Sequence, residues 1–410
     1  MTMSWESISL SDALRPLKSS PFTRDELNYS GGRYQNVHYG DILVRFPSVV
    51  DAEKEGLPYV NDSSEVRCTR CTLLQNGDII IADTAEDEAV GKAIEIQGIK
   101  DLKIVSGLHT MAFRPQEGLF APGFLGYFLN SSVYHNQLLP LMQGIKVLSI
   151  SKTAIGDTVI KYPSYKEQEK IVESLSVVDD MIGALDEAIA KKRQIKEGLM
   201  QQLLTGKTRL PGFSGEWKDI LFKSIYKYAK EGGTPSTGVA EYYNPATVPF
   251  AKIEDLKDKY LTSVESYISE SGVEHSSAWI IPVNSVILSN GATLGEVSIN
   301  KIPTTTKQGI LGIILKEEFS PEFIYYLFKG RPFRREMERV TTHGTMDCAY
   351  LKDLNTISLR IPSLAEQDAI ASVIASVDKE IVGLEAQRDK YTLIKQGMMQ
   401  ELLTGKTRLI

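Results

Sequence analysis

The repeated stretch LLTGKTRL is the first place where this sequence could do chemistry, because Gly-Lys-Thr is the end of a phosphate-binding P-loop. It begins at Leu203 and again at Leu402. A P-loop needs another glycine five residues before its second one, and both copies have glutamine there. The preceding residues are helix formers and do not predict a strand. The stretch therefore predicts a helix end, with Gly206 and Gly405 as left-handed caps. Four cations that would favour the negative end of a helix follow these glycines: Lys207, Arg209, Lys406 and Arg408.

The cysteines and histidines form no recognisable catalytic or metal-binding pattern. Cys68 and Cys71 make a single C-x-x-C, without the second pair or the histidines that a zinc site needs. His109 and His343 have no nucleophile or acid partner that is evident in the sequence. We therefore expect neither a metal site nor a catalytic histidine.

Two further enzyme classes require motifs that are not found. An adenine methyltransferase needs a D/N-P-P-Y/F loop, and YNPAT at Asn244 lacks the second proline and the aromatic residue. A nuclease needs acidic metal ligands with a lysine at fixed spacing. The nearest stretch, KIEDLKDK around Glu254 and Asp255, is interpreted as solvated charged surface. No catalytic residue is predicted.

Length and composition predict a globular protein of two or three domains. The chain has 410 residues, of which 42% are hydrophobic. Three cysteines make no disulfide framework, and neither a signal peptide nor a membrane span is evident, so a cytoplasmic location without membrane contact is expected. The net charge of -6 argues against a wholly basic nucleic-acid-binding protein, although it allows a local basic face.

An internal duplication explains why the opening stretch occurs twice. The segment from Pro163 to Leu210 aligns with the segment from Pro362 to Leu409 at a constant offset of 199 residues. Each copy begins with the S-x-x-E spacing of a capping box, Ser164 with Glu167 and Ser363 with Glu366. Each is then expected to form one helix of about forty residues, or roughly 60 Å. Apolar residues step by four and three along both copies, which predicts a coiled-coil seam; ordinary core helices are the alternative. The seam residues are Ile171, Leu175, Val178, Ile182, Leu185 and Ile189 in the first copy, and Ile370, Ile374, Val377, Ile381 and Leu384 in the second.

The segments before the two helices are also related. NGDIIIA, VGKAIEI, GLHTMAFRP and FAPGFLGYFLNS predict three strands and a helix in the first half. VNSVILS, LGEVSIN, QGILGIILK and FSPEFIYYLFKG repeat that order in the second half, whereas the loops between them differ. Two similar scaffolds with dissimilar loops are what a protein needs to hold two different targets in related ways.

These segments resemble the DNA-specificity subunit of type I restriction-modification systems. VHYGDILVRF, NGDIIIADTAEDEAVGKA, SGLHTMAFRP and MQGIKVLSISKTAIGD resemble a target recognition domain, as do GGTPS, FAKIEDL, SNGATLGEVSI and TKQGI. The resemblance implies an α/β (α+β) fold with two recognition domains and two long helices packed as an antiparallel coiled coil. The implied boundaries are 1–163 and 216–362 for the recognition domains, and 164–215 and 363–410 for the helical spacers.

The resemblance also implies a non-catalytic subunit that reads double-stranded DNA. Each domain would read one half of a split site, while the helices set the gap and dock two methyltransferase subunits, alongside restriction/translocase subunits. No cofactor is expected on this chain; S-adenosylmethionine, ATP and Mg are expected on the partners. A scaffold that assembles partners without reading DNA, and a nuclease with an unrecognised motif, remain the alternatives.

DNA contact requires cations for phosphates and planar donors for base edges. The candidates in the first domain are the cations Arg45, Arg67, Arg70, Lys92 and Lys146. In the second domain they are the loop residues Gly232, Gly233 and Thr234, the cations Lys252, Lys307, Arg331, Arg334 and Arg335, and Asn290 and Gln308 as possible base readers.

Overall fold

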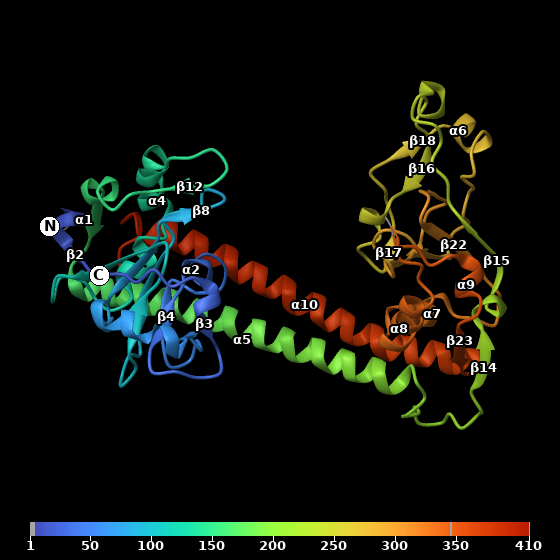
Figure 1. Ribbon diagram of the computed structural model, residues 1–410, viewed down its shortest axis with the longest axis horizontal. Helices are drawn as coiled ribbons and strands as arrows, with labels where there is room; N and C mark the ends of the chain where they lie inside the picture. Colours follow the sequence, from blue (N-terminus) through green and yellow to red (C-terminus); the bar gives the residue numbers. More distant parts are fainter. Residues whose placement is uncertain (1–4, 345–346, 410) are drawn as a thin grey trace. The chain divides into compact units, whose positions relative to one another are not determined.

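The computed structural model describes residues 5–344 and 347–409, which divide into two compact units. One unit comprises Met1–Glu187 and Glu385–Ile410, and the other comprises Ala188–Leu384. The two long helices, drawn in green and red in Figure 1, both pass from one unit into the other. Each unit therefore contains one globular domain together with parts of both helices.

The first unit is built on a five-stranded sheet. Its order is β2-β11-β7-β9-β5, and only the β5 pairing is parallel. The three predicted strands are its centre, and the predicted helix follows them, so these expectations are confirmed. The bounds are β2 Leu14–Pro16, β11 Thr110–Pro115, β7 Ile79–Ala82, β9 Ala93–Gln97, β5 Val49–Asp51 and α3 Phe124–Phe128.

The second unit repeats this topology. Its five-stranded sheet has the order β15-β22-β19-β20-β17, and again only the last pairing is parallel. The duplication inferred from the sequence is thus present in strand order and strand direction. The bounds are β15 Tyr226–Glu231, β22 Ile310–Leu315, β19 Val286–Ser289, β20 Val297–Asn300, β17 Tyr260–Leu261 and α7 Pro321–Lys329.

Smaller sheets also correspond between the units. In the first unit β4 pairs parallel with β10 and antiparallel with β6, as β16 does with β21 and β18 in the second. An antiparallel pair, β1 with β13 or β14 with β23, joins the two ends of each domain. The bounds are β1 Glu6–Ser9, β3 Leu27–Asn28, β4 Gln35–Val37, β6 Tyr59–Val60, β8 Thr84–Ala85, β10 Ile104–Ser106, β12 Leu148–Ser149, β13 Val159–Tyr162, β14 Lys218–Leu221, β16 Val248–Ala251, β18 Tyr267–Ile268, β21 Thr305–Thr306 and β23 Ser358–Ile361.

Short helices complete both domains. α3 and α7 supply buried aromatic residues, with Phe124 and Phe128 in the core of the first domain and Phe323 and Phe328 in that of the second. The other α-helices are α1 Leu10–Ala13, α2 Tyr39–Val44, α4 Ser132–Leu138, α6 Glu270–Glu274, α8 Arg331–Arg339 and α9 Leu351–Leu354. The 3-10 helices are η1 Arg24–Glu26, η2 Asp62–Arg70, η3 Leu139–Leu141, η4 Ala154–Asp157, η5 Phe222–Ser224, η6 Ala240–Tyr242 and η7 Ile253–Asp255.

The long helices α5 (Tyr165–Leu203) and α10 (Leu364–Leu402) each have 39 residues, as the duplication predicted. In both units the start of one helix packs beside the end of the other, so the helices run antiparallel. The first unit buries Ile171 with Leu402, and the second buries Leu203 with Ile370. The predicted seam is confirmed: of its residues, Ile182, Leu185 and Leu384 are half-buried and the others are buried.

The two glutamates that predicted capping boxes have a different role. Glu366 is buried and accepts two hydrogen bonds from the guanidinium of Arg209, at 2.5 and 2.7 Å. Glu167 is buried and accepts two from Arg408, both at 2.7 Å. Each arginine lies just beyond a left-handed glycine cap, Gly206 with φ 69° or Gly405 with φ 73°. The LLTGKTRL stretch therefore ends one helix and clamps the beginning of the other. We call these two ion pairs the helix-end clamps.

A buried tyrosine anchors each domain to both long helices. Tyr127 of α3 donates to Asp179 of α5 at 2.8 Å, and Lys395 of α10 binds the same carboxylate at 2.6 Å. In the second unit Tyr326 donates to Asp378 at 2.7 Å, and Lys196 binds it at 2.5 Å. Because one carboxylate holds two partners, each domain is fixed to the helix pair within its own unit.

Removing a helix-end clamp is expected to destabilise the protein in a pH-dependent way. Arg408→Met leaves the buried Glu167 carboxylate without this guanidinium, so the thermal midpoint should fall by several degrees at neutral pH. Hydrogen bonds from Arg408 lower the pKa of Glu167. The clamp therefore stabilises the fold above the unfolded-state pKa of about 4.3, and this contribution is lost as the pH falls through the lower folded-state pKa.

The measurement is thermal unfolding of wild type and variant from pH 7 down to pH 3. Lys406→Met is the matched control, since that side chain is exposed and two positions away. A difference between wild type and Arg408→Met that does not shrink in acid would contradict a charge-based clamp.

Candidate nucleic-acid interface

Several predicted DNA-binding residues of the second domain gather at one end of its large sheet, where the strands meet their loops. The Gly233 amide donates to the Thr306 carbonyl at 3.0 Å, and the Lys307 amide donates to the Ala251 carbonyl at 2.9 Å. The loop that follows β15 is thereby held against the end of β21, and the loop that precedes β22 is held against the end of β16. This group, which we call the second-domain edge, contains Gly232, Gly233, Thr234, Lys252, Lys307 and Gln308.

The two glycines of this edge shape the loop and do not face outward. A Cβ atom on Gly232 would lie 2.1 Å from the Thr306 carbonyl oxygen, and one on Gly233 would lie 2.1 Å from the Ser277 hydroxyl. Both glycines are buried, whereas Thr234 beside them is exposed. Lys307 and Gln308 are exposed as well. The side chains available to a ligand at this edge are therefore those of Thr234, Lys307 and Gln308, with Lys252 half-buried beside them.

Asn290 departs from the expectation of a base reader. It is fully buried, and its side-chain amide donates to the Ala349 carbonyl at 3.2 Å. Its backbone amide donates to the Gly309 carbonyl at 2.9 Å, and its carbonyl accepts from Ala349 at 2.8 Å. Asn290 thus joins the end of β19 to the neighbouring segments, and in this conformation its side chain does not face solvent.

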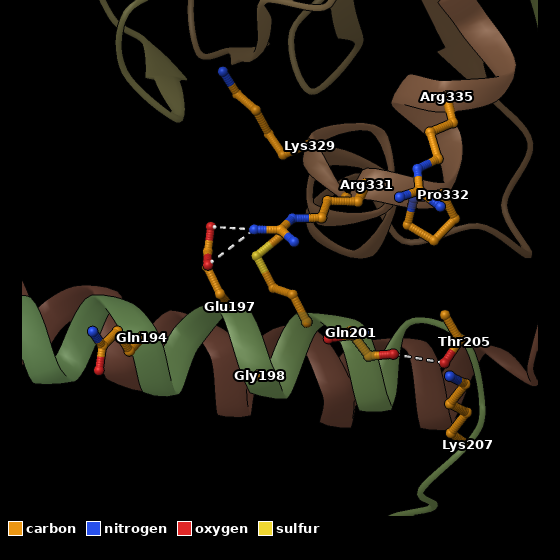
Figure 2. Close-up of a pocket in the computed structure, with 12 residues that line it drawn as sticks. Gln194, Glu197, Gly198, Gln201, Thr205, Lys207, Lys329, Arg331, Pro332 and Arg335 are labelled. Atoms are coloured by element: carbon orange, nitrogen blue, oxygen red, sulfur yellow. Dashed lines mark hydrogen bonds and ion pairs between the residues drawn. The ribbon is translucent and has the colours of Figure 1, made fainter. Parts of the chain in front are cut away.

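The predicted arginines of the second domain lie apart from this edge, on α8. Arg331 and Arg335 line a hollow of about 560 Å³ in the second unit. Figure 2 shows Arg331 reaching towards Glu197 of α5, to which it donates at 3.3 and 3.4 Å. Arg334 donates to the Gly295 carbonyl at 3.4 Å. The hollow contains more cations than anions, and its charged lining residues are Glu197, Lys207, Lys329, Arg331 and Arg335.

Three of the predicted cations in the first domain make contacts within the domain. Arg45 donates to the Gly56 carbonyl at 3.4 Å, and Arg67 pairs with Glu26. Lys92 donates to the Leu43 carbonyl at 3.0 Å, and burial lowers its pKa.

The other two predicted cations, Arg70 and Lys146, are exposed. Arg70 ends η2, whereas Lys146 lies in a turn closed by a bridge between Gln143 and Ser149. The five predicted cations thus belong to four separate segments of the domain: the end of α2, η2, the residue before β9 and the turn before β12.

Both histidines that lacked a partner in the sequence have an acidic neighbour in the structure. The Nδ1 atom of His109 lies 3.3 Å from the Asp83 carboxylate, and that of His343 lies 3.1 Å from Asp347. The duplication provides a signal for the first pair, because Asp83 follows β7 as Asn290 follows β19. Sequence reasoning selected Asn290 and missed Asp83.

The thiols and carboxylates give no sign of a metal site. Cys68 is buried in η2, which raises its pKa to about 11, and the Cys71 thiol donates to the Arg67 carbonyl at 3.4 Å. Within residues 5–344 and 347–409, no group of three or more His, Cys, Asp or Glu side chains could hold a metal ion. Over the same residues, none of the helices is both long enough and apolar enough to span a membrane.

Comparison with known proteins gives one consistent result. Residues 214–391 match the type I restriction modification DNA specificity domain. The MjaX type I restriction enzyme specificity subunit of Methanocaldococcus jannaschii is 24% identical, over 99% of this chain and 94% of its own length. The MjaIX specificity subunit of the same organism is 31% identical over 42% of this chain and 40% of its length. The EcoR124I/EcoR124II specificity subunit of Escherichia coli is 25% identical over 56% and 60%.

Two solved structures share the fold. A chain from a type I restriction-modification system, determined to explain complex assembly and conformational transition, superposes with a TM-score of 0.61 at 16% identity. That match covers 98% of this chain and 97% of the other. The S subunit of a type I system from M. genitalium has a TM-score of 0.56 at 14% identity, over 98% and 96%. At these identities the likeness establishes the architecture of two domains and two long helices.

Proposed function

We propose that this chain, as a DNA-specificity subunit of the type I restriction-modification family, reads a split DNA site. Each of its two domains reads one half of that site. One observation carries the proposal. The same five-stranded sheet occurs twice, and different side chains stand at the same edge of each copy. Where Gly309 precedes β22 in the second domain, His109 precedes β11 in the first. Two related surfaces with different polar groups suit two different half-sites.

The second-domain edge has the chemistry for both parts of DNA recognition. Lys307 offers a cation for a phosphate, and its neighbour Gln308 offers a planar amide that can bind the N6 and N7 atoms of adenine. Both are exposed on a loop that backbone hydrogen bonds hold in place. The α8 arginines would extend phosphate contact along the same domain.

The subunit acts with partners and does not catalyse the reaction itself. The relatives are specificity subunits, and they give no support to a scaffold that ignores DNA. We place the methyltransferase at the two helical regions, 164–215 and 363–410, whose equivalent sequences offer two equivalent docking surfaces. S-adenosylmethionine, ATP and Mg would then be bound by partner subunits. The recognition domains are proposed to span 1–163 and 216–362.

Substitutions at Lys307 and Gln308 should separate the two kinds of contact. Lys307→Ala is expected to weaken DNA binding for all sequences and to reduce the slope of log affinity against log salt by about 1. Gln308→Ala is expected to leave that slope unchanged and to relax one position of one half-site, at a cost of about 1–3 kcal/mol for the preferred base. The measurement is a salt-series binding titration of the complex with its methyltransferase partner, on cognate and single-mismatch duplexes.

Lys218→Ala is the matched control, because Lys218 is exposed on β14 and lies outside the second-domain edge. Salt-independent binding by the wild type, or equal affinity for unrelated duplexes, would contradict the proposed function. Unchanged binding by both Lys307→Ala and Gln308→Ala would exclude the second-domain edge as a DNA contact, without contradicting the proposed function.

A further inference from the structure

Three polar side chains of the first domain stand at or beside the positions that correspond to Asn290 and Gly309, next to the second-domain edge. Asp83 and Thr84 directly follow β7, and His109 directly precedes β11. The Asp83 amide donates to the His109 carbonyl at 3.1 Å, as the Asn290 amide donates to that of Gly309 at 2.9 Å. The two positions are therefore equivalent in the repeat. None of the cations predicted from the sequence belongs to this group, which we call the Asp83 cluster.

The side chains of the Asp83 cluster are bonded to one another and partly open to solvent. The Thr84 hydroxyl donates to the Asp83 carboxylate at 2.7 Å. The Nδ1 atom of His109 lies 3.3 Å from that carboxylate and 3.3 Å from the hydroxyl. The His109 side chain is 46% exposed and that of Asp83 is 29% exposed. Mutual hydrogen bonds fix these groups, while each keeps a surface for a ligand.

His109 adopts a backbone conformation that is uncommon for a residue other than glycine. Its φ is 53°, in the left-handed region, where the equivalent Gly309 has φ 87°. Few residues other than glycine occupy this region, and such residues concentrate at functional sites. The Tyr39 ring packs edge-on against the imidazole, with centroids 5.3 Å apart. The first domain thus has an imidazole at the position where the second domain has glycine. We infer that the His109 side chain, and not its backbone conformation, is the functional feature of this position.

A cation lies on the segment paired with this cluster. β8, which contains Thr84, pairs with β12, and the Ile150 amide donates to the Asp83 carbonyl at 2.9 Å. The turn that precedes β12 carries the exposed Lys146. Planar polar groups with a neighbouring cation are the combination that base edges and an adjacent phosphate require.

We propose that Asp83, Thr84 and His109 read bases in the first half-site, and that Asp83 selects a base with an amino group in the major groove. This inference rests on the proposed function. A carboxylate only accepts hydrogen bonds, so it favours the amino groups of cytosine or adenine and disfavours the oxygen acceptors of thymine or guanine. The second domain has glycine at the His109 position and a buried Asn290, so its half-site is read differently.

Two substitutions test the cluster by methylation mapping with the assembled methyltransferase complex on a randomised DNA library. Asp83→Asn exchanges an acceptor for a group that both donates and accepts. It should reduce the preference for cytosine or adenine at one position of one half-site by about tenfold or more. His109→Gly suits the left-handed backbone and copies the second domain, so it should fold normally and still lose selectivity within the same half-site.

Asp101→Asn is the matched control, because it removes an exposed carboxylate between β9 and β10, at the opposite end of the sheet. The other half-site reports within each experiment that the variant is folded and assembled. Retention of the wild-type motif by both variants would overturn the role of the cluster while leaving the proposed function intact. A wild-type complex that methylates no split motif would instead overturn the proposed function.

Discussion

Replacing residues 216–362 with the corresponding domain of another specificity subunit is expected to change one half of the methylated site and to leave the other half unchanged. The two domains are structurally independent, since each has its own sheet, core and polar edge. The effect should be complete: the old half-site is no longer methylated and the donor's half-site replaces it. Methylation mapping of the chimaera measures both halves in one experiment.

The design of this chimaera follows from the anchors within the second unit. The donor domain should keep a tyrosine at the position of Tyr326, which binds Asp378, and a tryptophan at that of Trp217, which packs against Gly206. Arg209 and Glu366 remain outside the exchanged segment, so the clamp is retained. A reciprocal exchange of residues 1–163 is the control and should alter only the opposite half. A change in both halves from either exchange would contradict independent reading.

Lengthening both long helices together is expected to widen the unread gap while both half-sites keep their sequences. The clamps impose equal lengths, since 42 positions separate Glu167 from Arg209 and also Glu366 from Arg408. Four helix-forming residues inserted after Glu187 and four after Leu384 would add about 6 Å to each helix. That length is close to two base pairs at about 3.4 Å each.

The rotation that accompanies this insertion is close to that of the DNA. Four residues turn a helix by about 40° beyond one full turn, and two base pairs turn the duplex by roughly 70°. An insertion in α5 alone is the control. It should abolish methylation, because both clamps cannot then form with α10 at its original length. A fully active double insertion with an unchanged gap would show that the helices do not set the spacing.

The features that sequence reasoning predicted correctly depend on local periodicity. Apolar residues spaced four and three positions apart from Ile171 to Ile189 predicted the helix. They also predicted its buried face, because an apolar stripe on one helix requires a partner. The three strands and the helix of each domain followed from short apolar runs that occur twice in the same sequence order. Left-handed caps at Gly206 and Gly405 followed from residue type, since glycine pays no steric penalty there.

The features that were missed depend on residues far apart in the chain. Glu167 fits a capping box locally, yet its carboxylate binds Arg408, which is 241 positions away. Asn290 has the right chemistry for a base reader, but its side chain is buried and donates to the carbonyl of Ala349, which is 59 positions later. Asp83 and His109 meet only because β7 and β11 are neighbours in the sheet. No spacing rule in one sequence reveals such contacts before the sheet order is known.

We propose that this chain supplies sequence recognition to a catalytic partner. The most direct measurement is single-molecule mapping of adenine methylation on genomic DNA by the purified methyltransferase with S-adenosylmethionine, with and without this chain. A single split motif is expected when both proteins are present, and no methylation is expected from either protein alone. Methylation by this chain alone, or the same motif from the methyltransferase without it, would show that this chain is not the source of sequence recognition.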